Sequence, residues 1–278
     1  MKILITLLFI NIISSYGFIV NKINLNKLNY AKIKNKDFEE YLDDYDYEDI
    51  KEIKYIKKTL YKPRTPNQVK YFNDINNDTL QLLITSGPAG SGKTLFPTQY
   101  AAKLLLETDR KVILTRPLIS VDEELGYLPG GINEKMHPWV IPIFDILYEF
   151  ISPQKLEKLI HDKRIEIVPL AFMRGRTFKN CFIIGDELQN ASISQMLMLL
   201  TRLGNDSKLV ITGDISQCDN KENGLLDLQN RMKSFYNKNQ YKNFEEMLRN
   251  DKISLVNMEP EDVQRSELIS VILNIYNS

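Results

Sequence analysis

The sequence predicts an α/β fold in which a mainly parallel, doubly wound sheet is flanked by helices, with an N-terminal extension outside this core. Six short apolar runs have the length and composition of buried strands, and segments with helical periodicity lie between them. Strands that alternate with helices favour a parallel sheet covered on both faces. With 278 residues, 43% of them hydrophobic, the chain is long enough to bury one such core. The six runs are residues 82–85, 112–115, 165–170, 181–185, 209–212 and 253–256.

Three local signals mark helix ends between these runs. Ser192 and Gln195 have the spacing of a capping box, which predicts the start of a helix. Another helix is expected to end over residues 104–107. Pro260 is typical of the first turn of a last helix, which we expect to continue to the C-terminus.

Residues 1–17 have the pattern of a secretory signal peptide. One lysine precedes an apolar run that ends in small residues, and the run is too short to predict a membrane span, so we expect none in the mature chain. Residues 18–36 are basic and contain no acid, which together with the leader is typical of a plastid-type organelle route. The alternative is a cytoplasmic protein whose asparagine-, lysine- and isoleucine-rich composition gives an apolar start.

Residues 37–52 are acidic and rich in tyrosine, which predicts a solvated linker rather than a site. Three parts are therefore expected. They are the leader, a basic and then acidic extension of low order over residues 18–60, and a core domain over residues 61–278.

The overall charge excludes a strongly basic protein, because 36 Lys and Arg residues balance 36 Asp and Glu residues. Any nucleic-acid contact must therefore come from a local patch. The two cysteines, Cys181 and Cys218, form neither a zinc pattern nor a disulfide framework. His137 and His161 have no companions at metal-ligand spacing, so neither predicts a metal site.

The octapeptide GPAGSGKT follows the first apolar run and precedes a helical pattern, which is the context of a phosphate-binding loop. Glycines let backbone N–H groups surround phosphate oxygens, the side chain of Lys93 reaches the β- and γ-phosphates, and the Thr94 hydroxyl binds Mg²⁺. The predicted nucleotide-binding residues of this loop are Gly87, Pro88, Ala89, Gly90, Ser91, Gly92, Lys93 and Thr94.

Pro97 stands where the helix after this loop is expected. Proline removes the N–H that would bond the Lys93 carbonyl and crowds that carbonyl, at a cost of about 3 kcal/mol in a helix interior. We therefore expect a kink or a widened turn over residues 93–97, with the phosphate-binding N–H groups unaffected because they precede Pro97.

Polar residues follow two other apolar runs. Asp186 and Glu187 end the run over 181–185, so Asp186 is expected to hold Mg²⁺ and Glu187 to polarise the attacking water. Asp214 or Gln217, after the run over 209–212, is placed to sense the γ-phosphate, and Gln217 is the preferred sensor. The alternative for this last segment is a simple turn at Gly213.

Longer stretches over residues 64–71, 114–147, 173–204, 207–219 and 261–276 resemble, in order, the pattern of the PhoH-like ATPase family. The resemblance begins at Lys62 and continues to the C-terminus. It implies an ATP- and Mg²⁺-dependent ATPase with a RecA-like P-loop NTPase core related to superfamily 1 helicases. It also implies that Gln68 reads adenine. Pro97 departs from the family, which usually has helix formers there, and so do Leu188, where alanine is usual, and Gly185, where a bulky apolar residue is usual.

A single RecA-like domain cannot form an ordinary two-domain helicase motor. The resemblance therefore leads us to expect a homo-oligomer, with a ring as one arrangement, in which Arg265 acts as an arginine finger on the next subunit. The alternative is that Arg265 pairs with an acid on its own helix.

Some relatives in the family act on RNA, so single-stranded RNA is the expected partner. Arginine forks bind phosphates and aromatic rings stack on unpaired bases. The alternative is that the arginines form surface salt bridges and that Trp139 packs in the core. The candidate contacts are Arg116, Tyr127, Lys135, Trp139, Arg174, Arg176 and Arg202.

Three functions remain open from the sequence. The first is ATP hydrolysis coupled to RNA binding or unwinding. The second is an ATP-dependent regulatory switch without helicase activity. The third is a small-molecule kinase, against which Glu187 and Gln189 argue, because kinases of this kind often carry only the first acid of the pair.

Overall fold

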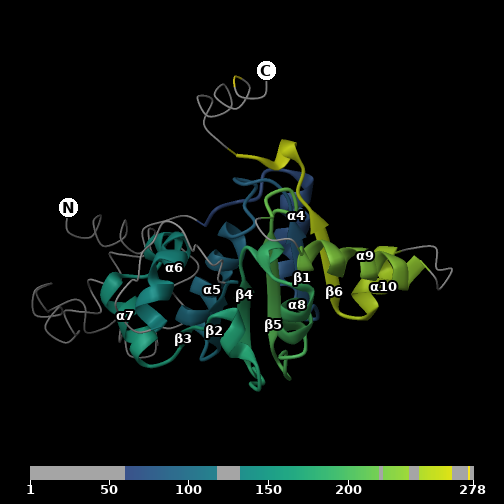
Figure 1. Ribbon diagram of the computed structural model, residues 1–278. Helices are drawn as coiled ribbons and strands as arrows, with labels where there is room; N and C mark the ends of the chain where they lie inside the picture. Colours follow the sequence, from purple (N-terminus) through teal and green to yellow (C-terminus); the bar gives the residue numbers. More distant parts are fainter. Residues whose placement is uncertain (1–59, 118–131, 219–221, 238–243, 265–274, 276–278) are drawn as a thin grey trace, which may run out of the picture. The chain divides into compact units, whose positions relative to one another are not determined.

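The computed structural model describes residues 60–117, 132–218, 222–237, 244–264 and 275, without the side chains of 132–139 and 237 (Figure 1). The leader and nearly all of the N-terminal extension lie outside the described residues. Over the part of the chain that is described, no helix combines the length and apolar character needed to cross a membrane.

Six strands form one parallel sheet in the order β3-β2-β4-β5-β1-β6, which confirms the predicted fold class. Each predicted apolar run forms a strand. The run over 165–170 forms only a three-residue strand and leads through Pro169 into the 3-10 helix η2 (Leu170–Met173). The strands are β1 (Leu82–Ser86), β2 (Lys111–Thr115), β3 (Ile165–Ile167), β4 (Cys181–Gly185), β5 (Lys208–Gly213) and β6 (Ile253–Asn257).

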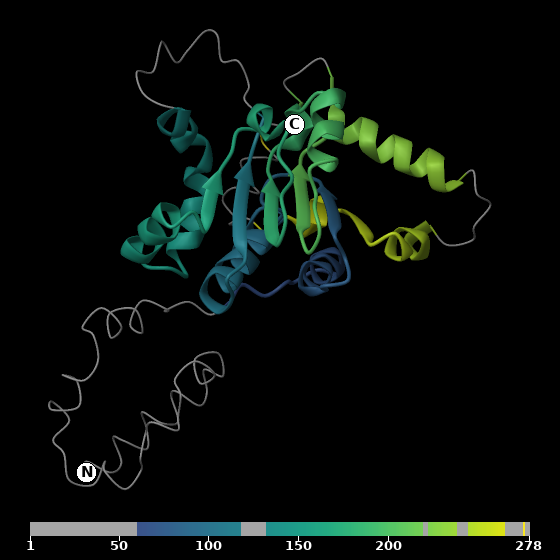
Figure 2. The ribbon, with the colours of Figure 1, turned by 90° about the horizontal axis from the view of Figure 1, so that it is seen from below.

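Helices cover both faces of the sheet (Figures 1 and 2). Alternate residues of a strand point to opposite faces, so Ile184 packs in one apolar cluster and its neighbour Ile183 in the other. One face carries α4 (Pro66–Asn76), α5 (Leu95–Glu107), α6 (Ile132–Tyr148) and α7 (Pro153–His161), and the other carries η2, η3 (Leu188–Asn190), α8 (Ile193–Leu200), α9 (Gly224–Asn237) and α10 (Phe244–Asn250).

The predicted helix ends can be compared with these bounds. Helix α5 ends at Glu107, and Ser192 and Gln195 form the predicted capping box of α8, with both reciprocal hydrogen bonds present. Pro260 begins only a three-residue 3-10 helix, η4 (Pro260–Asp262), and the predicted continuation of this helix falls outside the described residues beyond Gln264.

Candidate functional site

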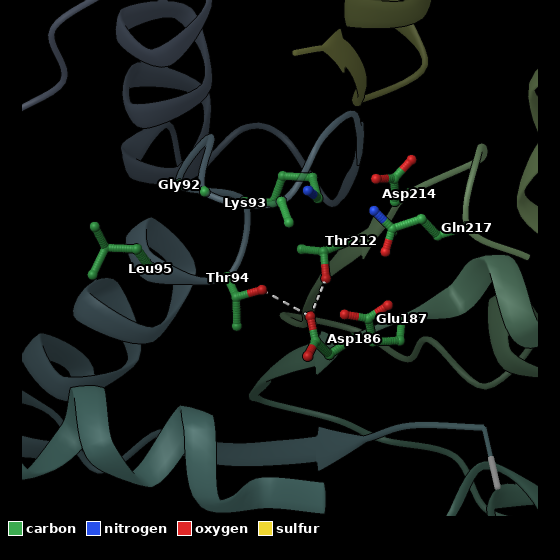
Figure 3. Close-up of a pocket in the computed structure, with 12 residues that line it drawn as sticks. Gly92, Lys93, Thr94, Leu95, Asp186, Glu187, Thr212, Asp214 and Gln217 are labelled. Carbon is green, nitrogen blue, oxygen red and sulfur yellow. Dashed lines mark hydrogen bonds between the residues drawn. The ribbon is translucent and has the colours of Figure 1, made fainter. Parts of the chain in front are cut away.

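A cavity of about 260 Å³ lies at the carboxyl ends of β1, β4 and β5 (Figure 3). Ligands of parallel α/β sheets bind at this edge, where the loops that follow the strands converge. Three segments form its walls: the loop after β1, the turn after β4 and the end of β5. The lining residues are Ala89, Gly90, Gly92, Lys93, Thr94, Leu95, Asp186, Glu187, Thr212, Gly213, Asp214 and Gln217.

The loop after β1 depends on glycine conformations. Gly87 has a φ of 144°, and a Cβ added there would lie 2.3 Å from the Met258 carbonyl oxygen. Gly90 and Gly92 have φ values of 85° and 90°, which turn the backbone back toward the cavity. Ser91 and Pro88 do not line the cavity, but the Ser91 hydroxyl donates to the Pro88 carbonyl at 2.8 Å and closes the loop.

The Lys93 ammonium also donates to the Pro88 carbonyl, at 2.7 Å. The side chain therefore folds against the loop that carries it. To contact β- and γ-phosphates as predicted, the Lys93 ammonium must leave the neutral Pro88 carbonyl for a charged phosphate oxygen. A hydrogen bond to a charged acceptor is the stronger of the two.

Asp186 is the meeting point of three segments. It is 5% exposed, and its Oδ1 accepts hydrogen bonds from the Thr94 hydroxyl at 2.9 Å and from the Thr212 hydroxyl at 2.5 Å (Figure 3). A hydroxyl beside a carboxylate is a donor set that suits Mg²⁺, which prefers oxygen ligands and keeps several waters. The two residues predicted to hold the metal are thus together, and the residues fit such an ion.

Thr212 was not among the residues predicted for the site. The only signal in the sequence is its position as the last apolar-run residue before Gly213 and Asp214. Its contact with Asp186 depends on β5 lying directly beside β4, and strand order cannot be read from the run itself.

Glu187 has a left-handed backbone conformation, with φ 54° and ψ 38°, at the start of η3. A residue other than glycine held in this region costs about 1–3 kcal/mol, and such residues cluster at active sites. The turn directs the carboxylate to the cavity wall, where the Gln189 amide donates to Glu187 Oε2 at 2.6 Å.

Gln189 joins the acid turn to the end of β5. The side chain is 1% exposed, its Nε2 also donates to the Gln217 carbonyl at 3.2 Å, and its Oε1 accepts the Asp214 N–H at 3.1 Å. One buried amide therefore fixes both segments that face the cavity across from the phosphate loop. This role was missed, since Gln189 served only to distinguish a hydrolase from a kinase.

Asp214 and Gln217 both line the cavity, as expected for a sensor segment. Asp214 Oδ1 accepts from the N–H and the hydroxyl of Ser216, at 3.0 and 2.6 Å, and so holds the turn that presents Gln217. The Asp214 Oδ2 atom is buried without a hydrogen-bond partner.

The departures from the family pattern at Gly185 and Leu188 lie against each other. A Cβ added to Gly185 would lie 3.1 Å from the Leu188 Cδ2 atom, which is tighter than ordinary contact. The small residue at 185 therefore makes room for the large one at 188, and both lie behind the acid pair rather than in the cavity.

Gln68 lies behind the phosphate loop rather than on the cavity wall. It is 2% exposed, and its Nε2 donates to the carbonyls of Ser91 and Asp262 at 3.2 and 2.8 Å. Its Oε1 accepts the Arg64 N–H at 2.9 Å. Both the nitrogen and the oxygen of the Gln68 amide are hydrogen-bonded within the protein, so contact with adenine would require these bonds to break. Adenine recognition by Gln68 therefore stays a prediction.

Pro97 is not in a helix interior, contrary to expectation. Helix α5 begins at Leu95, so Pro97 lies in its first turn, where proline is tolerated. The neighbouring helical bonds are made, from Phe96 N–H to the Gly92 carbonyl and from Thr98 N–H to the Thr94 carbonyl, each at 3.2 Å.

Among the candidate nucleic-acid contacts whose side chains the structure describes, all four arginines lie outside the cavity lining. Arg176 pairs with Glu166 at 2.7 Å and stacks 4.5 Å above the Phe178 ring, as the salt-bridge alternative predicted. Arg202 donates to the Arg176 carbonyl at 3.3 Å, Arg174 is exposed, and Arg116 directly follows β2. Tyr127 and Arg265 lie outside the described residues, as do the side chains of Lys135 and Trp139.

A parallel sheet with a phosphate loop after β1 and an acid pair after β4 defines a P-loop NTPase domain of RecA-like fold. The chain belongs to the PhoH-like protein family, whose model matches residues 61–277.

Relatives in three bacteria show the extent of the match. The chain is 45% identical over 162 residues to a PhoH-like protein of Synechocystis sp., covering 58% of this chain and 48% of the relative. It is 36% identical over 250 residues to a PhoH-like protein of Bacillus subtilis, covering 88% and 72%. It is 36% identical over 220 residues to Protein PhoH of Escherichia coli, covering 77% and 57%. The chain thus spans about half the length of the Synechocystis relative.

Two solved structures are similar to this chain at low scores. The UvsW helicase of bacteriophage T4 matches with a TM-score of 0.40 and 11% identity, over 76% of this chain and 67% of that one. The Sulfolobus solfataricus SWI2/SNF2 ATPase core in complex with dsDNA matches with a TM-score of 0.38 and 14% identity, over 72% and 47%. Neither likeness bears on the function of this chain.

Proposed function

We propose that this domain binds ATP with Mg²⁺ and hydrolyses it. The observation that carries the proposal is the meeting of Thr94 and Asp186 at 2.9 Å, with Glu187 beside them on the same cavity wall. A hydroxyl from the phosphate loop and a carboxylate from a second strand are the two protein ligands that a nucleotide-bound Mg²⁺ needs.

The phosphate loop supplies the binding groups. The turn before α5 lines the cavity at the N-terminus of that helix, where backbone N–H groups without helical partners favour an anion. Lys93 leaves the Pro88 carbonyl and donates to the β- and γ-phosphates. Thr94 and Asp186, the latter kept in place by the Thr212 hydroxyl, would hold a Mg²⁺ ion, which would supply positive charge next to the phosphates.

Hydrolysis requires an oriented water. Glu187 accepts a proton or hydrogen bond from that water, and the Gln189 amide holds the carboxylate in one position. Gln217 lies on the adjacent wall, where its side chain senses the γ-phosphate and its loss.

We extend the proposal to single-stranded RNA, which would couple to hydrolysis through the surface near Arg174 and Arg202, and to a homo-oligomer in which Arg265 completes the neighbouring site. The family membership supports this extension. The chain's balanced charge gives it no further support, so a regulatory ATP switch without RNA is the competing outcome of the test.

Phosphate release by the full chain, measured with and without single-stranded RNA or DNA, tests the proposal. We expect Mg²⁺-dependent release that Lys93→Ala abolishes and that Glu187→Gln lowers by at least about 100-fold while ATP still binds. Glu157→Gln, an exposed position on α7, is the matched control and is expected to be silent. Release without RNA stimulation or RNA retention would favour the switch, and Arg265→Ala with full activity would exclude the finger.

A further inference from the structure

The phosphate loop contains a carbonyl that its own helix cannot bond. Although α5 begins at Leu95, the series of i→i−4 hydrogen bonds already starts at the Gly92 carbonyl. In this series the N–H of residue 97 would donate to the Lys93 carbonyl, and Pro97 has no N–H. The bonds on either side of this position are made, at 3.2 Å each. The missing donor is replaced from another helix, because the Tyr71 hydroxyl donates to the Lys93 carbonyl at 2.9 Å.

Tyr71 is fixed in place by its surroundings. It lies on α4 with no exposed surface, and its ring packs edge-on against Phe96, with 6.4 Å between centroids and 76° between planes. Burial raises the pKa of Tyr71 well above its usual range, so the hydroxyl keeps its proton and remains a donor at any working pH.

The peptide between Lys93 and Thr94 is a rigid plane, in which the carbonyl and the N–H point in opposite directions. Holding the Lys93 carbonyl toward Tyr71 therefore directs the Thr94 N–H away from the core. Thr94 lines the cavity, and N–H groups in this first turn are the ones that have no partner within the helix.

We propose that Tyr71 is a positioning residue for the nucleotide, whose hydroxyl replaces the amide missing at Pro97 and aims the Thr94 N–H at the phosphates. The inference rests on the proposed nucleotide binding, and it makes Tyr71 and Pro97 a functional pair. Tyr71 acts through the loop and does not itself touch the nucleotide.

The test is a double-mutant cycle in the full chain, with the non-hydrolysable analogue AMP-PNP and Mg²⁺ as the probe in calorimetry. Loss of one neutral hydrogen bond predicts that Tyr71→Phe binds about 3- to 10-fold more weakly. Pro97→Ala is expected to bind at least as tightly as the natural chain. In the Pro97→Ala background, adding Tyr71→Phe is expected to change affinity less than about twofold, because the backbone N–H regained at this position restores the bond to the Lys93 carbonyl.

Tyr100→Phe is the matched control, since Tyr100 is also a buried tyrosine, packed 5.1 Å from Phe182 outside the loop, and is expected to leave affinity unchanged. Equal weakening by Tyr71→Phe in both backgrounds would show a role in packing only and overturn the proposal, as would no weakening at all. If Tyr71→Phe alone does not fold, the double variant with Pro97→Ala is expected to fold. Failure of the double variant to fold would also overturn the proposal. AMP-PNP binding without phosphate release would refute hydrolysis alone, whereas no binding by the natural chain would refute both.

Discussion

Replacing Gln189 by alanine removes the amide that holds the proposed catalytic carboxylate. The bond from Gln189 Nε2 to Glu187 Oε2 is 2.6 Å long and ends on a charged acceptor, so it is worth about 1.5–3 kcal/mol. If this energy keeps Glu187 aligned in the transition state, its loss lowers kcat by about 10- to 150-fold. KM is expected to change less than about threefold, because Gln189 does not line the cavity.

The assay is steady-state phosphate release at saturating ATP and Mg²⁺, with melting curves in parallel. Stability needs this control because the substitution also leaves the buried Asp214 N–H without its acceptor, at about 1–3 kcal/mol. Gln195→Ala is the matched control, since it breaks the bond to the Ser192 N–H in the capping box and weakens α8 without reaching the site. A folded Gln189→Ala protein with kcat within twofold of the natural chain would refute the reasoning, as would an equal loss in Gln195→Ala.

Three further predictions follow from single contacts. Gly87→Ala is expected to abolish measurable nucleotide binding, because the new Cβ would lie 2.3 Å from a backbone oxygen; Gly175→Ala, also at positive φ but in open space, should bind normally. Thr212→Val removes the hydroxyl that donates to Asp186 Oδ1 at 2.5 Å. The Mg²⁺ concentration for half-maximal activity is expected to rise about 10-fold, and an unchanged Mg²⁺ titration would count against a metal site at Asp186. Burial lowers the pKa of Lys208 to about 8, so the folded protein releases this proton while the unfolded chain keeps it to about pH 10.5. Stability should therefore rise by about 1–2 kcal/mol between pH 8 and 9.5 in urea titrations, a rise that Lys208→Met removes; the same slope in both proteins would contradict the assignment.

The sheet was predictable because its strands are buried on both faces and read as continuous apolar runs. The loop after β1 was predictable because phosphate binding constrains several neighbouring residues at once, so the information is local. The exception is β3, where the apolar run is longer than the strand because the chain passes through Pro169 into η2.

Contacts that depend on strand order or on a distant helix were not predictable. Thr212 reaches Asp186 only because β5 lies next to β4, and Tyr71 reaches the Lys93 carbonyl from a helix that precedes β1. The Pro97 prediction was wrong about the interior of the helix, because the sequence does not show that the loop delays the first helical turn until Leu95. Burial of the Gln68 amide against three backbone groups is likewise a tertiary property.

The strand order places the phosphate loop after β1 and the acid pair after β4 on the two sides of β5. β5 lies between the strand that carries the phosphate loop and the strand that carries the acids, so these two strands are about 10 Å apart at a spacing of about 4.8 Å per strand. That separation leaves room for the cavity at the end of β5. The Thr94 side chain is still close enough to donate a hydrogen bond to Asp186. The intervening strand supplies Thr212 below and Gln217 at the far wall, and Gln189 ties it to the acid turn. If the domain binds a nucleotide as proposed, a change at the γ-phosphate position would therefore reach the turn after β4 and the end of β5 together, because Gln189 links these two segments.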